Sequence, residues 1–142
     1  MESHKDIIRL LGGAKGVGRP VRNLTDLDQA IQEGLPRAAL EHLMSAVAPE
    51  GERAKLRNRV VPRASFQRSK TLSAAHSATT ERLARITALV RSVWEDDDKA
   101  QRFLWTAHSE LRGHKPIEVA LTELGAREVE AVIQRGLHGL PV

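Results

Sequence analysis

Ten lysine and arginine residues lie between Arg53 and Arg91, against a single acidic residue, Glu81. Hydroxyl and amide side chains are interspersed with this charge in residues 63–70. Lysine and arginine neutralise phosphates, whereas arginine, glutamine and serine side chains also offer hydrogen bonds to base edges. The combination predicts a surface that binds nucleic acid.

The densest part of this region, residues 52–71, is predicted to form two short helices separated by Val60, Val61 and Pro62. In a helix-turn-helix the second helix enters the major groove, where arginine can bind guanine and glutamine can bind adenine. We predict base readout by Arg63, Ser65, Gln67 and Arg68, and phosphate contacts by Lys55, Arg57, Arg59 and Lys70. A solvated basic surface is the alternative, because the turn lacks the glycine common in such motifs.

The positive charge is confined to one part of the chain. The 142 residues carry 22 basic and 18 acidic side chains, a net charge of +4. Residues 1–93 hold 16 basic and 9 acidic residues, whereas residues 94–142 hold 6 and 9. This asymmetry predicts two surfaces with different partners, one of them a polyanion.

Length and composition limit the class of protein. A hydrophobic content of 41% over 142 residues suits one domain, or two small domains that share a core. The absence of cysteine excludes a disulfide framework, a cysteine-ligated zinc finger and a cysteine nucleophile. Because no apolar run reaches the length of a signal segment or a membrane span, we expect a cytoplasmic protein with no membrane partner.

No set of side chains predicts catalysis. The acidic run of residues 95–98 could bind a divalent cation, but acids at the start of a helix more often cap backbone N–H groups. Residues 12–18 lack the lysine and hydroxyl residue that end a phosphate-binding loop. Trp94, Phe103 and Trp105 recur at helical spacing, which favours core packing over base stacking for the first two. We expect no enzyme, cofactor or metal, although an enzyme whose activity depends on Asp97 and Asp98 stays a third hypothesis.

The spacing of apolar residues predicts helices throughout and no strand, and therefore an all-α fold. Four glycines and a proline in residues 12–20 predict a flexible segment, residues 1–23, before the folded body. We expect Thr25 to cap the first body helix, a second helix to begin at Pro36, and the longest helix to follow Ser77, Thr79 and Thr80. Asp97 or Asp98 is predicted to cap the next helix.

Beyond this long helix, the chain has a turn that runs from Leu111 through Gly113 to Pro116. Pro116 is predicted to open a helix that Gly125 closes, and a last helix is predicted to end at Gly136. With the preceding pattern at Ala100, Phe103 and Leu104, this framework resembles the toxin-binding domain of Xre/MbcA/ParS-type antitoxins. Residues 72–86 resemble the linker that joins this domain to a degenerate Xre-type helix-turn-helix.

The resemblance implies an antitoxin of a type II toxin–antitoxin system. Its C-terminal domain would bind and neutralise a cognate RES-domain toxin, which depletes NAD, by covering the toxin's active site. Its N-terminal half would bind operator DNA of its own operon for autoregulation. We expect a homodimer, or a higher hetero-oligomer with the toxin.

Carried over to this chain, the resemblance places the toxin contacts in two segments. They are the turn, at Leu111, Gly113 and Pro116, and the chain end, at Gly136, Leu137, His138, Leu140, Pro141 and Val142. Packing within the domain is an alternative for both segments: Leu111 and Pro116 can simply set the loop, and the apolar end can cover its own domain.

These expectations divide the chain into three parts. Residues 1–23 are the flexible segment, residues 24–76 the helix-turn-helix domain, and residues 77–142 the toxin-binding domain with its tail. A stand-alone dimeric helix-turn-helix transcriptional regulator without a toxin partner is the alternative function.

Overall fold

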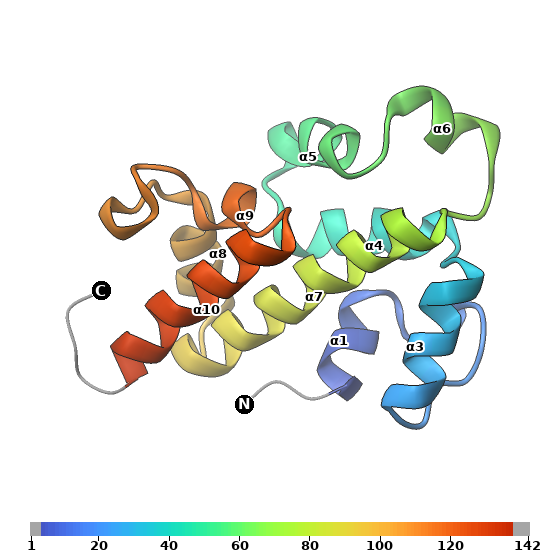
Figure 1. Cartoon of the computed structure of the whole chain (residues 1–142), viewed down its shortest axis with the longest axis horizontal. Helices are drawn as coiled ribbons and strands as arrows, with labels where there is room; N and C mark the ends of the chain where they lie inside the picture. Colours follow the sequence, from blue (N-terminus) through green and yellow to red (C-terminus); the bar gives the residue numbers. More distant parts are fainter. Residues whose placement is uncertain (1–3, 138–142) are drawn as a thin grey trace.

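The computed structural model describes residues 4–137, and in that range the chain forms helices and no strand, which confirms the all-α class. Figure 1 shows their arrangement. The elements are α1 (His4–Leu10), α2 (Gly13–Val17), α3 (Leu24–Glu33), α4 (Arg37–Val47), the 3-10 helix η1 (Glu50–Glu52), α5 (Arg53–Val60), α6 (Arg63–Arg68), α7 (Ala74–Trp94), α8 (Asp97–Trp105), the 3-10 helix η2 (Ser109–Leu111), α9 (Pro116–Val119) and α10 (Glu123–Leu137).

Helix α7 is the centre of the molecule, with α1, α3, α4, α8 and α10 packed around it. It begins earlier than predicted, because the hydroxyl of Ser73 accepts a hydrogen bond from the N–H of His76 and caps the first turn. Ser77 and Thr80 lie inside the helix and are fully buried. The Ser77 hydroxyl accepts the N–H of Leu35 at 2.8 Å, and this bond joins α7 to the start of α4.

The first helices pack on the body, so the prediction of a flexible segment over residues 1–23 is wrong for residues 4–17. Ile7, Leu10 and Leu11 are buried in the same core as the rest of the molecule. Gly12 and Gly18 adopt left-handed backbone conformations, with φ of +97° and +86°, at the two ends of α2. These glycines therefore turn the chain between helices, a role that glycine performs without steric cost.

Two other predicted helix starts are displaced by a few residues. Asn23, rather than Thr25, caps α3, because its side chain accepts the N–H of Asp26 at 2.8 Å. Asp96 caps α8 by accepting the N–H groups of Asp98 and Lys99. The acidic run thus caps a helix, and residues 4–137 hold no group of three acidic or histidine side chains placed to bind a metal.

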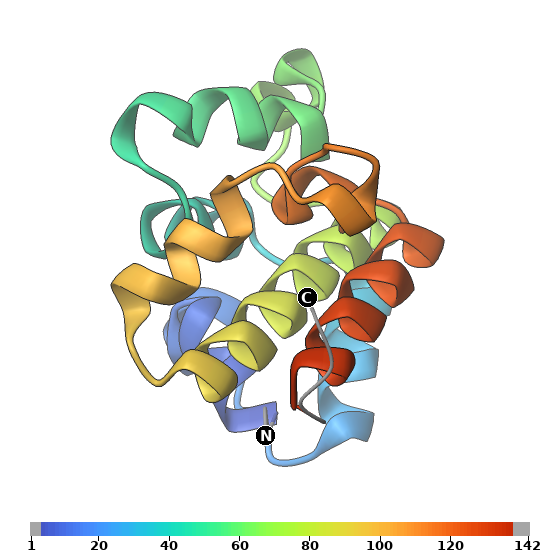
Figure 2. The same ribbon diagram turned by 90° about the vertical axis from the view of Figure 1, so that its left-hand side faces the viewer.

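Helices α5 and α6 lie together at one end of the molecule, next to α4, in both views (Figures 1 and 2). Leu56, Val60 and Phe66 anchor them to the core. Helix α6 ends at Arg68, two residues before the predicted end, since the chain becomes extended and pairs with the start of α4. There the N–H of Arg37 donates to the carbonyl of Lys70 at 2.8 Å.

One continuous cluster of buried apolar side chains runs through the described chain, from α1 to α10. The predicted boundary at residues 76 and 77 falls in the first turns of α7, which packs against helices on both sides of it. Among the described residues, no helix is both long and apolar enough to cross a bilayer.

Candidate functional site

The predicted nucleic-acid-binding side chains divide into an exposed set and an engaged set. The exposed side chains are those of Lys55, Arg63, Gln67, Arg68 and Lys70. Arg63 and Arg68 are the two ends of α6, and Ser65 of the same helix is half-buried. Within the described part of the chain, the guanidinium of Arg68 bonds to its own helix, at the carbonyl of Ala64 and the hydroxyl of Ser65. The structure therefore brings these side chains to one end of the molecule.

Arg57 and Arg59 already have partners inside the molecule. The guanidinium of Arg57 lies over the ring of Phe66, 4.9 Å from its centroid, and helps to hold α6 against α5. Arg59 donates to the carboxylate of Glu118 in α9 at 2.9 Å. A phosphate would have to compete with these contacts, so both side chains are less available than the sequence predicts.

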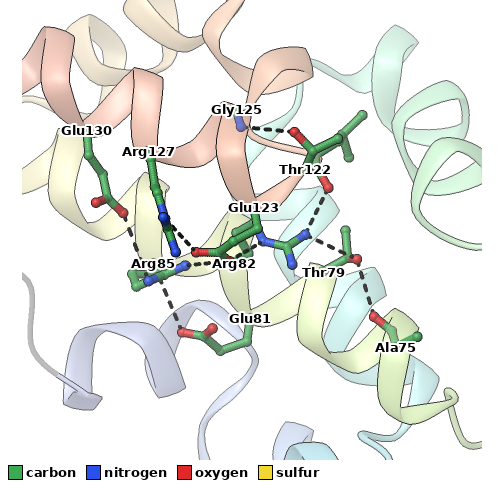
Figure 3. A network of polar contacts seen from close by, with 11 residues as sticks. Ala75, Thr79, Glu81, Arg82, Arg85, Thr122, Glu123, Gly125, Arg127 and Glu130 are labelled. Carbon is green, nitrogen blue, oxygen red and sulfur yellow. Dashed lines mark hydrogen bonds and ion pairs between the residues drawn. The ribbon is translucent and has the colours of Figure 1, made fainter.

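The remaining arginines of the basic region turn inward, as the polar network between α7 and α10 in Figure 3 shows for two of them. Arg82 is largely buried and donates to the carbonyl of Leu121 at 2.9 Å and to the carboxylate of Glu123 at 3.2 Å. Arg85 lies 3.8 to 4.0 Å from three carboxylates, those of Glu81, Glu123 and Glu130. These arginines bind α10 to α7 and do not belong to the basic surface.

Glu81 stands on α7 at the edge of this network (Figure 3). Burial raises the pKa of the Glu81 carboxyl above its ordinary value of 4.5, and the nearby Arg85 and Arg82 offset only part of that effect. Ionisation of Glu81 therefore lowers the free energy of unfolding, and stability should depend on pH for this reason.

The turn between α8 and α9 is set by backbone hydrogen bonds around His108. The carbonyl of His108 accepts the N–H groups of Leu111 and Gly113, and its N–H donates to the carbonyl of His114. Gly113 is exposed and has a φ of +77°, which an L side chain rarely adopts. Leu111 is fully buried and Pro116 is buried, so the packing alternative is favoured for these two side chains.

Two ion pairs fix this turn to α10. Arg112 donates to Glu128 at 3.0 Å, and Arg135 donates to Glu110 at 2.7 Å. These contacts hold the turn against α10, with Gly113 and His114 exposed on it.

The corner between α9 and α10 corrects the predicted role of Gly125. This glycine does not close a helix: it lies in the first turn of α10, where its N–H donates to the hydroxyl of Thr122 at 3.0 Å. A Cβ atom at Gly125 would stand 1.8 Å from the carbonyl oxygen of Val119. The Thr122-x-x-Gly125 spacing thus combines a helix cap with a close backbone approach.

Residues 89–139 match the family model of the antitoxin Xre/MbcA/ParS C-terminal toxin-binding domain. This part of the chain is similar to that toxin-binding domain, and residues 89–139 are called the antitoxin domain below. The matched residues begin in the second half of α7 and include α8, η2, α9 and α10. No curated protein matches the chain.

The antitoxin domain shares the last turns of α7 with the N-terminal half and is also joined to α4. The indole N–H of Trp105 donates to the carbonyl of Val47 at 2.9 Å, and the side-chain amide of Gln101 donates to the same carbonyl at 3.3 Å. Sequence reasoning missed these contacts, because nothing in the spacing of Val47 and Trp105 shows that they meet.

The predicted toxin contacts at the chain end are only partly within the described residues. Gly136 is exposed in the last turn of α10, and the backbone of Leu137 ends that helix. His138, Leu140, Pro141 and Val142 lie outside the described residues.

Proposed function

We propose that this chain is the antitoxin of a type II toxin–antitoxin system, which binds and neutralises a cognate RES-domain toxin and binds the promoter of its own operon. The family match over residues 89–139 carries the proposal, because that domain is defined by toxin binding. The RES class of the toxin, with its depletion of NAD, rests on the resemblance of the sequence.

For the toxin contact we propose the end of α10 and the residues that follow it, which would cover the toxin's active site. The proposed residues are Gly136, Leu137, His138, Leu140, Pro141 and Val142. The exposed side of the 108–116 turn, at Gly113, would extend this contact, with Leu111 and Pro116 supporting it from within the domain.

For the DNA contact we propose the exposed surface of α5 and α6. Arg63, Gln67 and Arg68 would reach base edges, and Lys55 and Lys70 would contact phosphates. Because α6 has only six residues, one copy would bury little DNA surface, so we expect a homodimer or a higher hetero-oligomer with the toxin on the operator.

Growth rescue tests the toxin half of the proposal. The gene next to that of this chain should encode a RES-type protein that arrests cells when expressed alone and is harmless when this chain is expressed with it. The proposal is wrong if no such gene lies next to it and if the chain also fails to rescue cells that express a RES-type toxin.

A stand-alone dimeric transcriptional regulator is the second candidate, and the exposed basic surface of α5 and α6 favours it equally. The two candidates differ in what the chain end does. Removal of residues 137–142 should abolish rescue from the toxin if the chain is an antitoxin, and should leave every activity of a stand-alone regulator intact.

A further inference from the structure

A groove with aromatic walls lies in the antitoxin domain, between the end of α7 and the residues of α8 and the turn that follows it. The rings of Trp94, at the end of α7, and Phe103, in α8, stack with centroids 4.7 Å apart and an interplanar angle of 29°. His108 meets Phe103 edge-on at 6.0 Å. The groove has a volume of about 350 Å³, and both aromatic side chains remain half-buried.

Two cations, Lys99 and Arg102, stand on the rim of this groove. Both are exposed, and within the described chain neither has a carboxylate at ion-pair distance. In contrast, Arg112, Arg127 and Arg135 of the same domain each pair with a glutamate. The lining of the groove therefore holds two cations without an ion-pair partner among the described residues, in the part of the chain with an acidic excess.

The four acidic residues that precede Lys99, residues 95–98, lie outside the lining of the groove. Asp96 caps α8, and Asp97 faces the other way, 3.6 Å from the guanidinium of Arg91. No aspartate or glutamate lines the groove itself.

His108 also lines the groove and can donate a hydrogen bond. Its Nδ1 accepts the N–H of Glu110 at 3.1 Å, so the neutral ring carries its proton on Nε2. An apolar, aromatic floor with cations and a donor at its edge suits an apolar side chain flanked by carboxylates.

We propose that this groove is a second docking site for the toxin, which takes a toxin segment with an aromatic or aliphatic anchor between acidic residues. The anchor packs against the stacked rings of Trp94 and Phe103, and its acidic neighbours pair with Lys99 and Arg102. This inference rests on the proposed antitoxin function.

Charge reversal of the rim tests the site. The purified toxin encoded by the adjacent gene is titrated with the full chain, with the double variant K99E/R102E and with the control K5E/K15E, which changes net charge equally on exposed residues of α1 and α2. Reversal should weaken toxin binding about 10- to 100-fold, because like charges then face each other across the contact. The control should bind as the unaltered chain does.

A second variant and a cross-linking experiment distinguish a lost contact from a misfolded variant. Phe103→Leu retains an apolar side chain but removes the stack, and should weaken binding without loss of helical circular dichroism. A carbodiimide joins lysine amines to carboxylates in contact, so Lys99 should be linked to a toxin aspartate or glutamate that has an apolar neighbour.

The outcomes separate the two proposals. If the unaltered chain does not bind the toxin, the proposed function fails and the docking site fails with it. If the unaltered chain binds and K99E/R102E binds equally well, the docking site alone is wrong. A Lys99 cross-link to a second copy of this chain would also overturn it, since the groove would then be a contact between copies.

Discussion

At the scale of single residues, the ion pair between Arg59 and Glu118 connects the two proposed surfaces. Arg59 belongs to α5 of the proposed DNA surface, and Glu118 belongs to α9 of the antitoxin domain. Both side chains are partly exposed, at 53% and 40%, so the pair contributes little to stability and can be broken at small cost.

Glu118→Gln should therefore strengthen operator binding. The substitution releases the Arg59 guanidinium for a phosphate and removes a negative charge beside the proposed DNA surface. The expected gain is about two- to five-fold in affinity at low salt, as measured by fluorescence anisotropy. Glu41→Gln, at an exposed position on α4, is the control. An equal gain in operator affinity for both variants would show that the Arg59–Glu118 pair has no specific role.

Arg63→Ala and Arg68→Ala should each weaken operator binding by about 1–3 kcal/mol, because each removes a side chain proposed to reach base edges. Lys55→Ala should mainly reduce the salt dependence of binding, since a phosphate contact releases a counterion. Mobility-shift titrations at two salt concentrations measure both effects. If both arginine variants bind the operator as the unaltered chain does, α6 is not the recognition helix.

Glu81→Gln should alter the pH dependence of stability. Because burial raises the pKa of Glu81, the folded chain holds this proton more tightly than the unfolded chain does. The free energy of unfolding therefore falls as pH rises from 4.5 through the raised pKa, and above that range the ionised carboxylate remains a cost. The free energy of unfolding of the variant should not decrease over this pH range. At pH 7 the variant should be at least as stable as the unaltered chain.

Denaturant unfolding at a series of pH values measures the effect, with Glu41→Gln as an exposed control. A Glu81 variant that is clearly less stable at pH 7 would contradict the expectation. It would mean that the pairing of Glu81 with Arg85 outweighs the cost of burial.

At the scale of elements, the corner between α9 and α10 depends on Gly125 more than the 108–116 turn depends on Gly113. An added Cβ at Gly125 meets the Val119 carbonyl oxygen, whereas one at Gly113 has no atom within 4 Å. Gly113→Ala therefore carries only the left-handed backbone cost, about 1–2 kcal/mol.

Gly125→Ala should lower the free energy of unfolding by about 3 kcal/mol or more, because the corner must open to remove the overlap. Urea unfolding of the two alanine variants gives the comparison. Equal losses would show that a small shift of the corner relieves the close approach at Gly125.

The elements also show what a single sequence can and cannot predict. The helical class, the position of α5 and the opening of α9 by Pro116 followed from apolar spacing and proline geometry. The packing of α1 and α2 did not, because the glycines that turn a chain between short helices have the same composition as a linker. Only their buried neighbours, such as Leu11, distinguish the two cases.

The candidate surfaces were predicted less completely than the fold, for a related reason. Charge density located the basic region, but whether an arginine faces solvent or a carboxylate depends on helices far away in the sequence. Arg82 and Arg85 meet α10, and Arg59 meets α9, contacts that no local pattern encodes. Trp94 and Phe103, which were expected to pack in the core, stack on each other and stay half-buried at the edge of a groove.

At the scale of the whole molecule, the two halves are built as one body around α7. The antitoxin domain shares this helix and is tied to the end of α4 through the carbonyl of Val47. A toxin bound to one half would therefore sit on elements in direct contact with those of the proposed DNA surface. Even so, the side chains assigned to toxin and to DNA are separate, so substitutions should affect one function at a time.

NAD consumption by the proposed toxin, the RES-type protein expected from the adjacent gene, tests the central claim most directly when it is measured while this chain is titrated in. We predict that consumption falls to zero at a fixed stoichiometric ratio, and that the double variant R63A/R68A inhibits as well as the unaltered chain. Undiminished NAD consumption with the chain in excess would contradict the assignment of this protein as the antitoxin.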